Sequence, residues 1–167
     1  MAITSVHYLR QADIFYELTP AQLEQVAALC DERRVNTGEV IFEENSSSDE
    51  LYVIAMGEVE IVVDPALVSD GKEGGPGPMT IVTLRRGQSF GEVALVDQGL
   101  RSATARGAQQ NTLLLVIPRN QLMKLCEADH GLGFRLMRNL AADLAMKMRN
   151  TDLQIRQQLL EGARRRG

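Results

Sequence analysis

Between Val35 and Val116 the chain repeats short runs rich in β-branched and aromatic residues, and turn residues separate each run from the next. The clearest runs are 40–42, 51–54, 59–63, 80–84 and 113–117. Gly, Asn, Asp and Ser fill the intervals, as in Thr37-Gly38 and Asn45-Ser46-Ser47-Ser48-Asp49, and these residues favour turns. Strands of this length and spacing are typical of a β-barrel or β-sandwich. With 167 residues, of which 44% are hydrophobic, the chain can bury a core of that kind without disulfides.

One interval is longer than the others and has a different composition. It extends over 64–79 and includes Asp70-Gly71 and Gly74-Gly75-Pro76-Gly77-Pro78, with no apolar periodicity. We interpret 64–79 as a mobile hairpin loop that joins two strands.

Helical patterns flank the β-rich region on both sides. Thr19-Pro20 predicts a helix start, because Thr caps a helix N-terminus and Pro suits the first helical position. We therefore predict short helices over 6–34. After Pro118 the helical pattern returns, pauses at 130–133 and continues as one long helix over 134–160. The predicted organisation is a helical lead-in over 1–34, a β-barrel over 35–118 and C-terminal helices over 119–163.

The long helix has two apolar stripes. Leu132, Leu136 and Leu140 repeat every four residues near its start. A second stripe alternates spacings of four and three, and consists of Met137, Ala141, Leu144, Met148, Thr151, Ile155 and Gln158. That alternation is typical of a two-stranded coiled coil, so we predict a homodimer through the second stripe while the first docks on the barrel. The alternative is a single amphipathic helix packed on its own domain.

Charge and composition exclude several classes of function. A net charge of −4 and a pI near 5.3 disfavour a phosphate backbone as partner, and we interpret Arg164, Arg165 and Arg166 as a solvated helix end. No window approaches the roughly 20 apolar residues that span a membrane, and the N-terminus has neither signal-peptide nor transit-peptide character. We therefore predict a cytoplasmic protein with no membrane partner.

Two further features argue against metal chemistry and catalysis. Cys30 and Cys126 are far apart, with no CxxC and no nearby His, so we interpret them as core residues and predict no metal. No nucleophile, base and orienting group occur at related spacings, so we predict no enzymatic activity.

The stretch 90–104 carries the residues that suggest a ligand. Gly91 allows a close approach of the backbone, a helical turn starting near Glu92 would direct free N–H groups at an anion, and Arg101 supplies a forked cation suited to phosphate. Glu92 would repel a phosphate unless it faced a hydroxyl donor. The predicted ligand therefore carries a hydroxyl next to a phosphate.

These residues occur in the order of a known family. The matching segments are 38–42, 49–54, Gly57-Glu58-Val59, Phe90-Gly91-Glu92-Val93-Ala94-Leu95 and Arg101-Ser102-Ala103-Thr104. With them the chain resembles the cyclic nucleotide-binding domain of the catabolite activator protein, of the cAMP-dependent kinase regulatory subunits and of cyclic nucleotide-gated channels. The resemblance implies a mostly β fold with flanking helices, namely a double-stranded β-helix (jelly-roll) barrel followed by a long C-terminal helix.

The resemblance also implies roles for individual residues. Glu92 would hold the ribose 2′-hydroxyl, and Arg101 would pair with the cyclic phosphate. The backbone of Gly91, Ser102 and Ala103 and the Ser102 hydroxyl would complete the phosphate cradle, and Val59 and Ile61 would line an apolar wall. Val93 is also expected among the ligand-binding residues. Thr151 and Asp152 would accept a hydrogen bond from the adenine amino group, and Lys147, one turn earlier, would approach the ribose or Glu92. The expected ligand is cAMP, with cGMP as the alternative, and no other cofactor is expected.

Three departures qualify the resemblance. Asn45 and Leu100 stand where many members have Gly and Pro, and after the long helix we expect no helix-turn-helix module, so no direct DNA binding is predicted. The leading hypothesis is a sensor domain that signals through its C-terminal helix to a partner protein. The alternatives are a scaffold or dimerisation module that binds no ligand, and a regulatory fragment of a larger transcription factor or enzyme.

Overall fold

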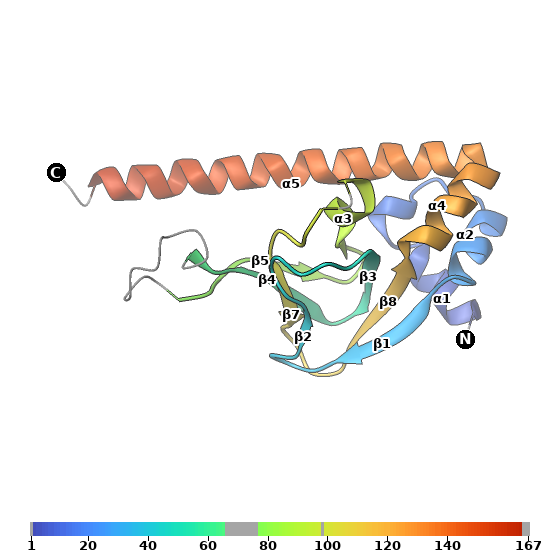
Figure 1. Ribbon diagram of the computed structural model, residues 1–167, viewed down its shortest axis with the longest axis horizontal. Helices are drawn as coiled ribbons and strands as arrows, with labels where there is room; N and C mark the ends of the chain where they lie inside the picture. The colour runs from blue at the N-terminus through green and yellow to red at the C-terminus, as the bar shows by residue number, and fades with distance from the viewer. Residues whose placement is uncertain (1, 66–76, 98, 165–167) are drawn as a thin grey trace.

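Two four-stranded antiparallel sheets form the centre of the computed structural model, which describes residues 2–65, 77–97 and 99–164 (Figure 1). The first sheet has the order β1 (Asp31–Val35), β8 (Thr112–Pro118), β3 (Glu50–Met56) and β6 (Ser89–Phe90). The second has the order β2 (Val40–Phe42), β7 (Thr104–Gly107), β4 (Glu58–Val63) and β5 (Met79–Arg85). The two sheets face each other, which confirms the jelly-roll barrel predicted from the sequence.

Strand β3 is buried on both faces and thereby separates two hydrophobic cores. Successive side chains of a strand point to opposite sides, so Leu51, Val53 and Ala55 face the helices while Tyr52 and Ile54 face the barrel interior. Strand β8 divides its residues in the same way, and it pairs with β3 along most of its length. The continuous apolar runs that predicted these strands reflect burial on both sides.

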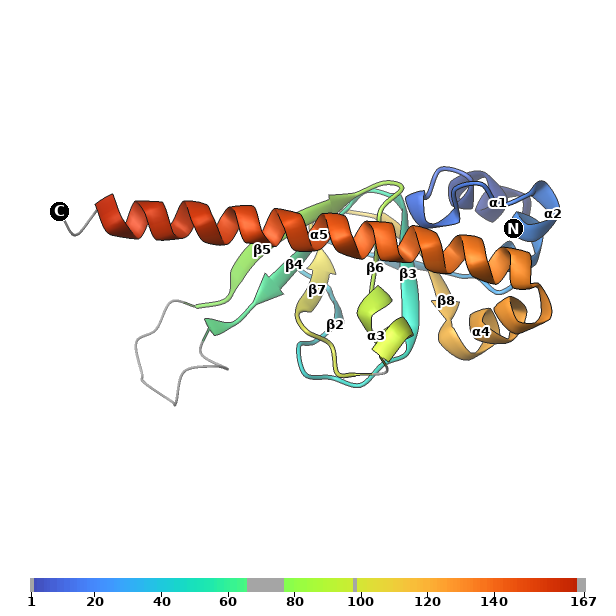
Figure 2. The same ribbon diagram turned by 90° about the horizontal axis from the view of Figure 1, so that it is seen from above.

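Helices cover one end of the barrel, and the last of them also runs across the barrel (Figure 1). Helix α1 (Ala2–Leu9), a 3-10 turn η1 (Asp13–Phe15) and α2 (Pro20–Ala27) precede the strands, and α4 (Arg119–Ala128) and α5 (His130–Arg164) follow them (Figures 1 and 2). The predicted helix start at Thr19-Pro20 is confirmed, because Thr19 and Gln22 form a reciprocal capping box. Cys126 is buried in the core beneath these helices, and Cys30 packs against it.

Two sequence-based boundaries are wrong. The segment 31–34 was predicted to be helical but belongs to β1, an edge strand whose pairing with apolar β8 compensates for its own polar residues. The predicted pause at 130–133 is the first turn of α5, and the chain breaks at Asp129 instead. A Cβ on Gly133 would lie 2.9 Å from the carbonyl oxygen of Cys126, so this glycine serves close packing of α5 on α4 rather than ending a helix.

Helix α5 consists of a buried and an exposed half. Leu132, Leu136 and Leu140 are buried in the core on the helical side, which confirms the predicted docking stripe. Beyond Leu140 no described residue of the helix is fully buried, and Figure 2 shows that it extends past the end of the barrel. Within the described ranges, no helix combines the length and apolarity that crossing a bilayer requires.

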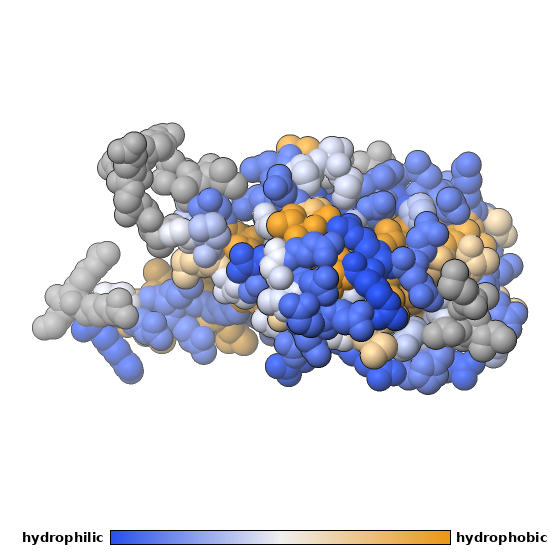
Figure 3. All heavy atoms as spheres, turned by 90° about the horizontal axis from the view of Figure 1, so that it is seen from below, coloured by the Kyte–Doolittle hydropathy of each residue, from blue (hydrophilic) through white to orange (hydrophobic). Residues whose placement is uncertain are grey.

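The face of the barrel opposite α5 is mainly hydrophilic, with apolar side chains visible near its middle (Figure 3). Strand β4 ends at Val63 and β5 begins at Met79, which is consistent with a connection between two paired strands. Most of the loop predicted over 64–79 lies outside the described residues, as does the end of the predicted basic tip, residues 165–167.

Candidate ligand-binding site

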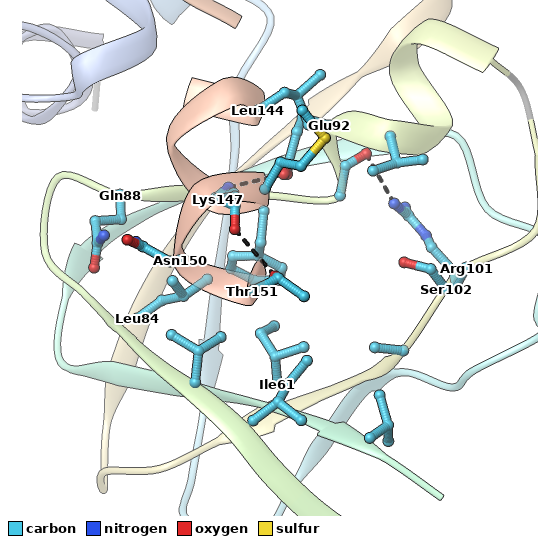
Figure 4. A pocket seen from close by; sticks show the side chains of 18 of the residues that line it. Ile61, Leu84, Gln88, Glu92, Arg101, Ser102, Leu144, Lys147, Asn150 and Thr151 are labelled. Carbon is cyan, nitrogen blue, oxygen red and sulfur yellow. Dashed lines mark hydrogen bonds and ion pairs between the residues drawn. The ribbon is translucent and has the colours of Figure 1, made fainter. Parts of the chain in front are cut away.

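A cavity of about 410 Å³ lies between the barrel and α5 (Figure 4). Barrel strands, the short helix α3 (Glu92–Asp97) and the exposed half of α5 all contribute to its wall. Most of the ligand-binding residues expected from the resemblance border this one cavity, and these are Ile61, Gly91, Glu92, Val93, Arg101, Ser102, Ala103, Lys147 and Thr151.

Gly91 allows the backbone to turn sharply at the cavity wall. Its φ is +81°, in the left-handed region that side chains disfavour, and a Cβ there would lie 2.6 Å from Nη1 of Arg101 and 2.9 Å from the carbonyl oxygen of Glu50. Any other residue would therefore displace the arginine. The turn also starts α3 with Glu92 as its first residue.

Arg101 is held by hydrogen bonds on each of its three nitrogen atoms. Nε donates to Oγ of Ser48 at 2.8 Å, and Nη2 donates to the same oxygen and to the carbonyl oxygen of Glu50. Nη1 donates to the carbonyl oxygen of Gly91 at 3.0 Å. The guanidinium also stacks on the ring of Phe42, with its central carbon 4.2 Å from the ring centroid.

The charge of Arg101 is buried without a counter-ion. The residue is 3% exposed, and none of the ion pairs between described residues involves it. Every hydrogen-bond partner that the structure gives the side chain is a neutral oxygen. Burial lowers the pKa of the guanidinium, as expected when water is withdrawn from a cation. The carboxylates of Glu50, Glu92 and Asp49 oppose this shift from a distance, but no described carboxylate lies within ion-pair distance of the guanidinium, so the site is suited to an anion that makes direct contact.

Glu92 presents the opposite case, because its carboxylate already has a cationic partner. It is 5% exposed, and Oε1 lies 2.8 Å from Nζ of Lys147 on α5. The same ammonium lies 2.8 Å from Oδ2 of Asp143 and donates to the carbonyl oxygen of Ser89 at 2.9 Å. Lys147 thus links the exposed half of α5 to the barrel, and Figure 4 shows it extended towards Glu92.

Uncharged polar side chains also border the cavity, several of them from α5. Thr151 is one of them and donates to the carbonyl oxygen of Lys147, which leaves its own oxygen available as an acceptor. Gln88, Asn150 and Gln154 border the same cavity, and sequence reasoning missed all of them. The sequence pattern does not mark them as binding residues, because Gln88 follows a turn and the other two occupy exposed helix positions, where polar residues are common.

Two of the predicted ligand-binding residues are not among the described residues that line the cavity. Val59 is fully buried in the barrel core. Ile61, on the same face of β4, packs against that core and also borders the cavity. Asp152 is exposed on α5. It follows Thr151 by one residue, and one residue rotates a helix by about 100°, so the two side chains point in different directions.

Comparisons with known proteins identify the family and the fold. Residues 32–129 match the family model described as the cyclic nucleotide-binding domain. The chain is 27% identical over 158 residues to the "Cyclic AMP receptor protein" of Thermus thermophilus, covering 95% of this chain and 67% of that protein. It is 26% identical over 113 residues to human "cGMP-dependent protein kinase 2", covering 68% of this chain but 14% of the kinase.

A solved structure supports the fold. The crystal structure of a cyclic nucleotide-binding domain from Methylobacillus flagellatus KT superimposes with a TM-score of 0.76, at 20% identity, covering 93% of this chain and 83% of that one. At this identity the likeness concerns the fold alone.

Proposed function

Because this chain belongs to the cyclic nucleotide-binding domain family, we propose that it binds a 3′,5′-cyclic mononucleotide, preferentially cAMP, in the cavity beneath α5. The observation that carries the proposal is the buried Arg101 charge without a counter-ion. A cyclic phosphate has one negative charge, which none of the neutral oxygens bonded to the guanidinium supplies. Glu92, on the same cavity wall, offers an acceptor for a ribose hydroxyl.

The preference for adenine rests on an uncharged polar side chain that borders the cavity. The Thr151 oxygen can accept a hydrogen bond from the exocyclic amino group of adenine, whereas guanine presents a carbonyl oxygen at the equivalent position. The relative from Thermus thermophilus is named for cyclic AMP, which favours the same ligand.

Helix α5 is the element suited to report occupancy. It contributes Lys147 and Thr151 to the cavity, and beyond Leu140 none of its described residues belongs to a hydrophobic core, although Gln154 donates to the carbonyl oxygen of Ile81. A ligand that engages these side chains changes the interactions of α5 with the barrel, and a partner protein that binds α5 would sense the change. The predicted cytoplasmic location is part of this proposal.

Calorimetric titration tests the ligand directly. We expect one cAMP per chain, weaker binding of cGMP, and no heat with cyclic dinucleotides, because Arg101 is the one arginine among the described lining residues and the second phosphate would have no equivalent partner. Absence of binding by both cyclic mononucleotides would favour the scaffold alternative.

A homodimer through α5 is the second part of the proposal. Met148, Leu153, Ile155, Leu159 and Leu160 are large apolar side chains that lie exposed on one helix. Met148, Ile155 and Leu159 follow one another at spacings of seven and four and share one face of the helix, and this spacing suits a second copy. Leu144, Met148 and Thr151 of the predicted seam also border the cavity, so the dimer contact and the ligand site share one stretch of helix.

Light scattering measures the dimer. We expect a dimeric wild type and a monomeric Ile155→Glu variant, because two charges would face each other across the seam. Gln157→Glu adds the same charge to the same exposed helix and should remain dimeric. A monomeric wild type would contradict the seam.

A further inference from the structure

We propose that Ser48 is the positioning residue for Arg101, and that its neutral hydroxyl fixes the direction of the guanidinium without neutralising its charge. This inference rests on the proposed function, in which Arg101 pairs with the ligand phosphate. The sequence pattern places Ser48 in a turn and predicts no part for it in ligand binding.

One oxygen of Ser48 engages two nitrogen atoms on the same edge of the guanidinium. Nε donates to it at 2.8 Å and Nη2 donates to it as well, so rotation about the last bond of the arginine is restricted. The Phe42 ring restricts the plane of the group from one side. The carbonyl oxygens of Gly91 and Glu50 hold Nη1 and Nη2, and Ser48 is the side chain that holds the Nε edge of the planar group.

The loop that carries Ser48 is itself tied to the backbone of Arg101. The amide of Asn45 donates to the carbonyl oxygen of Arg101 at 2.8 Å, and the amide of Arg101 donates to the carbonyl oxygen of Ser46 at 2.9 Å. Asn45 adopts a φ of +62°, which Asn tolerates better than most residues. The position of Ser48 relative to the arginine is therefore set by backbone bonds, and its hydroxyl is preorganised.

The chemical type of residue 48 decides the charge of the site. Asp49 and Glu50 follow it directly, yet neither forms an ion pair with Arg101 within the described part of the chain. The Glu50 carboxylate accepts a hydrogen bond from the Tyr52 hydroxyl instead. A carboxylate at position 48 would supply an internal counter-ion and compete with the ligand phosphate for the same cation.

Variants at this position, titrated with cAMP and with adenosine, test the inference. We expect Ser48→Ala to weaken cAMP binding about tenfold and Ser48→Asp at least as much, because the first loosens the cation and the second neutralises it. Ser48→Thr keeps the hydroxyl and should retain affinity within about threefold. Adenosine lacks the phosphate, so its affinity should be unchanged throughout. Ser47→Ala, an exposed neighbour, is the matched control.

Two outcomes would show that Ser48 does not act through the charge of Arg101. Equal losses for cAMP and adenosine, or Ser48→Asp binding cAMP as tightly as wild type, would overturn the proposal. In the unliganded protein, the Nε–Hε NMR signal of Arg101, assigned by its absence in Arg101→Lys, should be protected from exchange in wild type and Ser48→Thr and lost in Ser48→Ala. Persistence of the signal in Ser48→Ala overturns the positioning role even if no cyclic nucleotide binds, and failure of wild type to bind refutes the proposed function alone.

Discussion

Arg101 and Glu92 are both almost fully buried in the wall of one cavity, but their charges are balanced in different ways. Arg101 has only neutral oxygens as hydrogen-bond partners, whereas Glu92 lies 2.8 Å from Lys147. The arginine end is thus oriented by neutral oxygens and has no anion within ion-pair distance among the described residues. At the glutamate end one ammonium serves two carboxylates, Glu92 and Asp143, so a ligand hydroxyl must share Glu92 with a side chain of α5.

This difference suggests that the two ends of the site contribute differently, one to affinity for the ligand and the other to the response of α5. Binding strength should come mainly from the arginine end, because the phosphate brings the opposite charge that this buried cation lacks in direct contact. The effect of the ligand on α5 should arise at the glutamate end, because Lys147 of α5 pairs with Glu92 and with Asp143 on the same helix. The following variants test each half of this contrast.

The largest effect is expected from Arg101→Ala. Removing one partner of a buried, hydrogen-bonded charge pair costs about 2–5 kcal/mol of binding free energy, so cAMP affinity should fall from about 30-fold to more than 1000-fold. Isothermal titration of both proteins measures it. Unchanged affinity would mean that the phosphate does not contact this cation.

Glu92→Gln should have a smaller effect, about tenfold, because the amide oxygen still accepts a hydrogen bond from the ribose hydroxyl but no longer as an anion. A 2′-deoxy analogue removes the same hydrogen bond from the ligand side. Titrating wild type and variant with cAMP and 2′-deoxy-cAMP completes a cycle in which the two losses should be less than additive. Fully additive losses would place the ribose hydroxyl elsewhere.

Lys147→Met should affect the free energy of unfolding of the unliganded protein more than any change at an exposed lysine. The substitution leaves two carboxylates, Glu92 and Asp143, without the ammonium that lies 2.8 Å from each. Because Lys147 is partly exposed, water screens the loss, and we expect a decrease of about 1–2 kcal/mol.

Urea denaturation measures this loss, with Lys124→Met on α4 as the control, since Lys124 is exposed. Equal stability of the two variants would show that the ion pair does not hold α5 against the barrel.

Thr151→Val should give the smallest effect, a change of a few-fold in the ratio of cAMP to cGMP affinity, because a single hydrogen bond to an uncharged group is lost. Asp152→Ala should leave the ratio unchanged, since Asp152 lies outside the cavity wall. Competition binding with both nucleotides gives the ratios. A ratio that responds to Asp152 and not to Thr151 would reverse the assignment of the base-reading residue.

Local sequence patterns were sufficient for much of the fold. Alternation and turn residues predicted the main strands, and the Thr19-Pro20 signal located α2, because these features depend on neighbours within a few positions. They failed for β1, whose polar residues have no strand pattern of their own and depend on β8 for pairing. They also failed at Gly133, where close packing on Cys126 overrides the helix-breaking tendency of glycine.

For the site, the sequence by itself determined that Gly91, Glu92 and Arg101 belong together, since a family motif keeps them within eleven residues. Only the tertiary structure decided that Ser48 orients Arg101, that Lys147 reaches Glu92, and that Asp152 lies outside the cavity wall. The physical reason is the separation along the chain. Arg101 and Ser48 are 53 residues apart, and Lys147 and Glu92 are 55 apart, so their contacts depend on how loop, barrel and α5 pack, which no local periodicity encodes.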